Sequence, residues 1–183
     1  VLVPYSASFD PTTDLTIEFW FSPGVTIDSG ISANKGLLSK ANTNTDANND
    51  WVFFWNSADA GRMRFGTYGD NIQTTTATWT ANQWYHIAVT VSSTNTANIY
   101  VNGVLDTYNN DSNISTNPIN GNQDTALNLG LAKVASGDLY FDGLIDEVKI
   151  YNTARTATQI YDSLRTTLVG TESNLIGYWN FNE

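Results

Sequence analysis

The chain contains no cysteine among its 183 residues. Disulfide bonds, zinc–thiolate sites and cysteine nucleophiles are therefore excluded, and the sequence does not report a redox compartment. There is one histidine, His86, and the sequence has neither a G-x-S-x-G nor an H-E-x-x-H motif. No apolar run approaches the roughly 18 residues that a membrane span needs. These absences remove several common catalytic centres and predict no insertion into a membrane.

Positive charge is also scarce. Eight Lys and Arg residues stand against 18 Asp and Glu residues, so the net charge is −10 at pH 7. This balance argues against nucleic acid and anionic membranes as partners, and it suits cation binding. The polarity comes mainly from Asn, Thr and Ser, a composition typical of a secreted or cell-surface bacterial protein. Because the chain starts at Val1 without Met, we expect a piece of a larger multidomain protein.

Short segments with the residue pattern of β-strands are separated by residues that favour turns. The segments LTIEFWF (15–21) and WYHIAVTV (84–91) alternate between two faces, and Asn102-Gly103 predicts a tight hairpin turn. Only one segment, near 156–165, predicts a helix, with Thr156 as its N-cap. Many short strands and one short helix indicate an all-β fold, an antiparallel β-sandwich or jelly roll.

Several segments, taken in order, resemble the laminin-G-like, concanavalin A-like jelly-roll family. The most specific are WYHIAVT, YVNG and FDGLIDEVKIYN, at 84–90, 100–103 and 141–152. The resemblance covers nearly the whole chain and implies one domain over 1–183, with two antiparallel sheets packed face to face. The closing segment LIGYWNFNE is either a final strand, which we favour, or the start of a neighbouring domain.

The same family includes pentraxins, which bind calcium, and the resemblance extends in part to their calcium loop. Adjacent acid and amide residues precede the WVFFWN strand, whereas the second calcium stretch, 132–138, holds only one acid. Calcium takes six to eight oxygen ligands. The resemblance therefore implies at most one calcium ion, a candidate cofactor whose ligands would come from Asp46, Asn49, Asp50 and Asp138.

Catalysis by paired carboxylates is not supported by the sequence. Glycanases of this fold place two acids at i and i+2 on one strand, whereas Glu18 has Thr16 and Trp20 at those positions. Asp146 and Glu147 are adjacent, so regular alternation points them to opposite faces. We expect Asp146 to face inward as a structural anchor and Glu147 to face solvent. The protein is predicted not to be an enzyme.

Aromatic residues on polar faces favour a binding role. Aromatic rings can stack on the C–H faces of sugars while neighbouring polar groups bind hydroxyls. We predict a non-catalytic, lectin-like carbohydrate-binding module whose partner is a glycan or cell-surface polysaccharide. The alternatives are a protein-adhesion domain or a spacer domain, and each aromatic residue could instead cover the sandwich. The candidate ligand-binding residues are Trp20, Trp51, Trp55, Arg64, Tyr68, Trp79 and Trp84.

Overall fold

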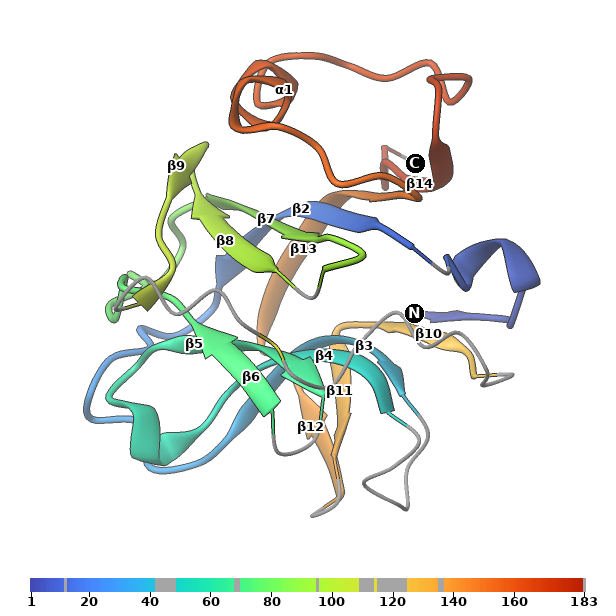
Figure 1. The fold of residues 1–183 in the computed structure, drawn as a ribbon. Coiled ribbons are helices and arrows are strands. Elements are labelled where there is room, and N and C mark those ends of the chain that lie inside the picture. The colour runs from blue at the N-terminus through green and yellow to red at the C-terminus, as the bar shows by residue number, and fades with distance from the viewer. Residues whose placement is uncertain are drawn as a thin grey trace.

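A computed structural model describes residues 1–11, 13–41, 49–67, 70–94, 96–108, 114, 125–134 and 137–182. Two antiparallel sheets pack face to face around one hydrophobic core, and a two-stranded hairpin lies beside the first sheet (Figure 1). The antiparallel sandwich predicted from the sequence is confirmed. Two short 3-10 helices, η1 (Ala7–Phe9) and η2 (Ser57–Asp59), connect strands.

The first sheet has the strand order β1-β10-β3-β4-β5-β6. The hairpin of β11 (Leu131–Val134) and β12 (Gly137–Tyr140) packs against the outer side of β3. This approach is so close that a Cβ on Gly36 would lie 2.2 Å from the carbonyl oxygen of Leu139. The six strands are β1 (Leu2–Val3), β10 (Leu127–Leu129), β3 (Lys35–Ala41), β4 (Asn49–Trp55), β5 (Met63–Thr67) and β6 (Asp70–Gln73).

The second sheet has the strand order β14-β13-β2-β7-β8-β9. The predicted turn joins β8 to β9, with φ of 51° at Asn102 and 79° at Gly103, both in the left-handed region that a type I′ turn needs. The segment LIGYW forms the edge strand β14, which is the final strand that we favoured over the start of a neighbouring domain. The strands are β14 (Leu175–Trp179), β13 (Gly143–Tyr151), β2 (Leu15–Pro23), β7 (Tyr85–Val91), β8 (Ala97–Val101) and β9 (Val104–Leu105).

The helix α1 (Ala157–Ser163) covers part of the outer face of the second sheet (Figure 1). It begins at a capping box, because Thr156 Oγ1 accepts from Gln159 N at 3.2 Å and Gln159 Oε1 accepts from Thr156 N at 2.9 Å. Ile160 is fully buried against Ala88 and Tyr100 of the sheet. The predicted helix and its cap are confirmed, and the helix divides this face into a covered part and an open part.

The predicted orientation of Asp146 is wrong, because β13 contains a β-bulge. The register with β2 shifts between Asp146 and Lys149, and Glu147 has a left-handed φ of 51°. The extra residue interrupts the alternation between the two faces. Ile145 packs against the core beside the bulge. Asp146 therefore points outward instead of inward, and its side chain is half-buried.

Candidate functional site

Three of the predicted ligand-binding tryptophans belong to the core. Trp51 is 2% exposed, and Trp55 and Trp79 are fully buried. Their rings contact other aromatic rings, and Trp79 Nε1 donates to the carbonyl of Gly61 at 2.8 Å. The expectation that these three contribute to a binding surface is corrected, because a buried ring cannot stack on a sugar. Strand alternation within WVFFW could have indicated this for Trp51 and Trp55, since it puts both on the same face as Phe53.

Arg64 lies on the outer face of the first sheet, away from the other candidates. Its guanidinium forms an ion pair with Asp59, and its Cζ lies 5.8 Å from the centroid of the Phe54 ring. The ion pair joins the side chain to η2, and the ring contact joins it to β4. Tyr68, another candidate ligand-binding residue, lies outside the described residues.

The candidate calcium ligands are described only in part. Asp46 lies outside the described residues, and Asn49 and Asp50 begin β4 with side chains that are not described. Asp138 is exposed on β12, opposite Lys133. Among the described ranges, no group of three or more His, Asp or Glu residues could hold a metal ion. The calcium site stays a prediction.

Two predicted residues, Trp20 and Trp84, share the open part of the second sheet's outer face. Trp20 on β2 is half-buried, with Asp146 and His86 as its cross-strand partners. The rings of Trp20 and His86 meet edge to face, with centroids 5.3 Å apart. Tyr85 packs into the core, so the preceding Trp84 faces outward by alternation, and it is 42% exposed.

Apolar and acidic groups flank these tryptophans. Leu144, which pairs with Ser22 on β2, is 62% exposed. Asp146 Oδ1 accepts from the backbone N of Glu147 at 2.8 Å, and its second oxygen has no hydrogen bond to any described group. An outward-facing indole pair beside an available carboxylate oxygen can stack on a sugar ring and accept from its hydroxyls. We call Trp20, Trp84, Leu144 and Asp146 the aromatic surface.

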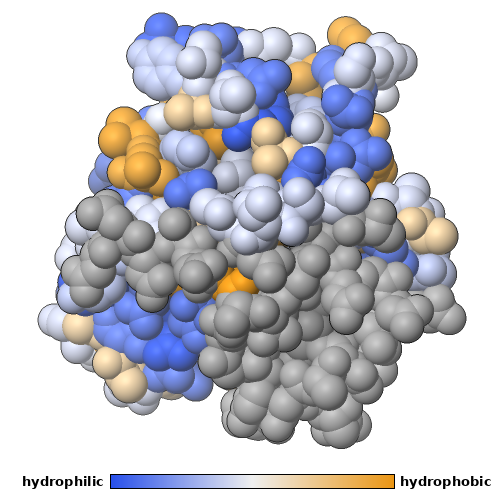
Figure 2. Space-filling view, viewed as in Figure 1, coloured by the Kyte–Doolittle hydropathy of each residue, from blue (hydrophilic) through white to orange (hydrophobic). Residues whose placement is uncertain are grey.

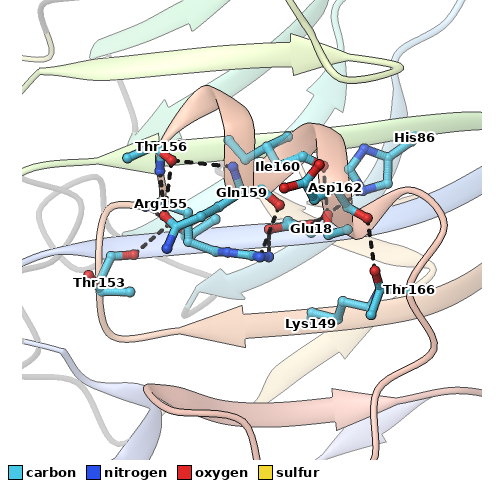
Figure 3. Close-up of polar contacts among 12 residues, drawn as sticks. Glu18, His86, Lys149, Thr153, Arg155, Thr156, Gln159, Ile160, Asp162 and Thr166 are labelled. Atoms are coloured by element: carbon cyan, nitrogen blue, oxygen red, sulfur yellow. Dashed lines mark hydrogen bonds and ion pairs between the residues drawn. The ribbon is translucent and has the colours of Figure 1, made fainter.

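A buried polar cluster lies beneath α1 (Figure 3), and its member His86 contacts Trp20 of the aromatic surface. The Glu18 carboxylate is fully buried and ion-pairs with Arg155, while Ser163 Oγ donates to its other oxygen. Arg155 also donates to the carbonyl of Gln159 at 3.0 Å and stacks over Tyr151, with its Cζ 4.4 Å from the ring centroid. These contacts join the helix and the segment before it to β2.

The cluster sets the charge states of two buried groups. Burial alone would raise the pKa of Glu18, but the approach of His86, the charge of Arg155 and the Ser163 hydroxyl together lower it below its usual value. Burial lowers the pKa of His86, although the Glu18 carboxylate 3.5 Å from its Nε2 opposes the shift. Glu18 is therefore ionised and His86 neutral near pH 7, and the neutral imidazole packs against the Trp20 ring.

Sequence reasoning did not find this cluster. Its only signal was a charged residue, Glu18, in the middle of an otherwise buried strand, which requires a partner. The partners Arg155 and Ser163 lie 137 and 145 residues further along the chain. No local sequence pattern could identify Arg155 and Ser163 as these partners, because only the tertiary fold places α1 over β2.

Two antiparallel sheets packed face to face define the class of concanavalin A-like β-sandwiches. The chain belongs to the concanavalin A-like lectin/glucanases superfamily, since a laminin-G family model with that description matches residues 1–161. No curated protein sequence is a significant match.

Solved structures with the same fold include a Bacteroides ovatus protein provisionally described as carbohydrate-binding. It has a TM-score of 0.66 and 18% identity, over 92% of this chain and 45% of that one. A heptameric SAP-like pentraxin from Limulus polyphemus has a TM-score of 0.55 and 18% identity, over 87% and 70% of the chains. A Trypanosoma rangeli sialidase has a TM-score of 0.52 and 15% identity, over 82% and 22%.

These likenesses define the fold. The chain spans less than half of the Bacteroides and Trypanosoma proteins. No helix in the described part of the chain is both long and apolar enough to cross a membrane.

Proposed function

We propose that this domain is a non-catalytic carbohydrate-binding module of a secreted or cell-surface bacterial protein, and that the aromatic surface binds its glycan. The observation that carries the proposal is the pair Trp20 and Trp84 on one open sheet face, beside the outward carboxylate of Asp146. Exposed apolar patches, more than single exposed residues, mark ligand-binding and interaction sites, and Leu144 extends the apolar surface of the two tryptophans. The fold shared with the Bacteroides protein is consistent with this role.

The positions of the acids support a binding role over hydrolysis. Glu18 is fully buried and both of its oxygens are engaged, so a substrate cannot reach it. Both Glu147 oxygens lie 2.9 Å from the donating hydroxyl of Tyr178, and Lys149 approaches Glu147 at 3.4 Å. Asp146 thus has no second available carboxylate beside it on β13 with which to flank a glycosidic bond.

A glycan array with matched variants tests the proposal. Wild-type protein should bind at least one neutral glycan, and Trp84→Ala should reduce that binding by about tenfold or more. Tyr140→Ala is the control, because Tyr140 is 69% exposed but lies on β12, against the first sheet. Equal binding by Trp84→Ala and wild type would refute the assignment of the surface, and silence across a broad array would refute glycan binding.

A protein-adhesion or spacer role is the second candidate, favoured by one feature of the surface. Val104 and Leu105 form the edge strand β9 and are 67% and 54% exposed, and Figure 2 shows apolar residues over β9. Exposed apolar edge strands are common places for contact with another protein. Silence on the glycan array, combined with capture of a surface protein that Val104→Lys abolishes, would support this role.

We further propose that one calcium ion assists the domain, with ligands from Asp46, Asn49, Asp50 and Asp138. The acidic net charge of −10 and the partial match to a pentraxin calcium loop support this. A ligand that binds only the native state stabilises it by about 2.7 kcal/mol at a concentration 100 times its Kd. Thermal unfolding in calcium should therefore occur at a higher temperature than in EDTA, and an unchanged Tm would remove calcium from the account.

A further inference from the structure

A concave site, separate from the aromatic surface, lies where the C-terminal end of β13, α1 and the segment before β14 meet. It is a cavity of about 370 Å³ whose lining includes Tyr151, Arg155, Asp162, Ser173 and Asn174. Leu144 of the aromatic surface lies near the opposite end of β13, roughly 20 Å away at about 3.3 Å per strand residue. The two sites therefore cannot share one sugar ring.

Fixed contacts hold both walls of this cavity. On one side, Arg155 stacks on Tyr151 and pairs with Glu18, which anchors it to β2. On the other side, the Glu172 carboxylate accepts from the backbone N of Val169 at 2.7 Å and of Gly170 at 2.9 Å. The cavity is thus preformed, as small-molecule sites usually are, and its volume falls within the roughly 300–1,000 Å³ typical of them.

Several lining groups retain unused hydrogen-bonding capacity. The side chains of Asp162, Ser173 and Asn174 form no hydrogen bond with any other described residue. Together they offer carboxylate and amide acceptors, amide donors and a hydroxyl, while Leu168 supplies an apolar contact. Figure 2 shows mostly hydrophilic residues over α1. Closely spaced donors and acceptors of both kinds match the hydroxyl pattern of a sugar better than an apolar ligand.

The charges restrict the ligand class further. Among the described lining residues, Arg155 is the only cation, and Glu18 already neutralises it, so Asp162 and Glu172 are the uncompensated charges there. A negatively charged sugar would meet repulsion in this cavity. We propose that the cavity is a second, separate glycan subsite that binds one uncharged sugar residue and excludes acidic sugars, which rests on the proposed carbohydrate-binding function.

Amide and indole NMR shifts of the full ¹⁵N-labelled chain test this proposal. The probes are the methyl glycosides of glucose, galactose and mannose, with N-acetylneuraminic acid as the anionic comparison, each up to about 20 mM, since single-sugar affinities lie in the millimolar range. At least one neutral glycoside should shift the amides of Asp162, Ser173 and Asn174 saturably. The acidic sugar should shift them less.

Two variants link the response to the cavity. Asn174 has a left-handed φ of 66°, so Asn174→Gly removes the amide without backbone strain, and the cavity affinity should fall about threefold to tenfold. Asp162→Asn should raise the cavity's affinity for the acidic sugar. Trp84→Ala should leave the cavity response unchanged. Unaltered cavity shifts in Asn174→Gly, or an acidic sugar that binds wild type as well as the neutral ones, would overturn the proposal.

This experiment tests the second subsite and the proposed function of the aromatic surface separately. Shifts at Trp20 and Trp84 without shifts at the cavity would overturn the second subsite and leave the proposed function intact. Shifts confined to the cavity would support the subsite and refute the aromatic surface as the glycan site. Silence at both sites with every probe would overturn both assignments.

Discussion

The ion pair between Arg155 and Glu18 gives the sharpest energetic prediction. Arg155→Met keeps most of the side-chain volume but removes the charge, and so leaves a fully buried carboxylate without its cation. Two unit charges about 4 Å apart attract by about 4 kcal/mol at an effective dielectric constant of about 20. Breaking a buried pair typically costs about 3–5 kcal/mol. Because Ser163 still donates to Glu18, we expect a loss of about 3 kcal/mol at pH 7.

The loss should depend on pH in a defined direction. In the wild type, the lowered pKa of Glu18 stabilises the fold above the unfolded pKa, and this stabilisation disappears as the pH falls through the folded pKa. In Arg155→Met, burial dominates and the pKa of Glu18 should instead rise, so the variant loses stability as the pH increases. The difference between wild type and variant should therefore be largest near pH 7 and should shrink to about 1 kcal/mol near pH 4.

Urea unfolding at the two pH values measures these free energies. Arg165→Met is the matched control, because Arg165 is exposed and has no ion pair in the described structure, so its loss should stay within about 0.5 kcal/mol. Glu18→Gln combined with Arg155→Met should recover about 2 kcal/mol relative to Arg155→Met, since the stranded charge is gone. A loss below about 1 kcal/mol at pH 7, or an equal loss at both pH values, would contradict the reasoning.

Two further substitutions test the fold around the sites. Gly36→Ala should destabilise the protein by about 1–3 kcal/mol, because its Cβ would lie 2.2 Å from a backbone oxygen of the β11–β12 hairpin. Urea unfolding measures this loss, and a near-wild-type result would show that the hairpin can move away. Thr156→Ala removes the N-cap of α1 and should cost about 1 kcal/mol, whereas Thr156→Ser should cost little; equal losses in both variants would argue against the capping role.

Much of the fold was predictable from local patterns. Alternation in LTIEFWF and WYHIAVTV, the Asn102-Gly103 turn and the Thr156 cap each depend on nearby residues, so the sequence carries them directly. The orientation of Asp146 was not predictable, because a β-bulge at Glu147 shifts the alternation of the side chains. No residue near Glu147 in the sequence indicates this bulge. A strand pattern read with period two fails wherever a single extra residue is inserted.

The candidate site was predictable only in part, for a different reason. Trp20 and Trp84 share a face because β2 and β7 pair in the observed register, which the two strand patterns separately suggested. Trp51, Trp55 and Trp79 were misassigned, since an aromatic residue next to polar residues in the sequence can still point into the core. The cavity between α1 and β14 depends on contacts between segments that are distant in sequence, and so no local motif reveals it.

The central claim is that Trp84 contributes to a glycan-binding surface, and calorimetric titration of variants tests it most directly. The glycan that binds wild type best should be titrated into wild type, Trp84→Ala and Tyr140→Ala, each first shown to be folded by near-ultraviolet circular dichroism. We expect about tenfold weaker binding for Trp84→Ala, equivalent to about 1.4 kcal/mol, and unchanged binding for Tyr140→Ala. Equal affinity of all three proteins would contradict the claim.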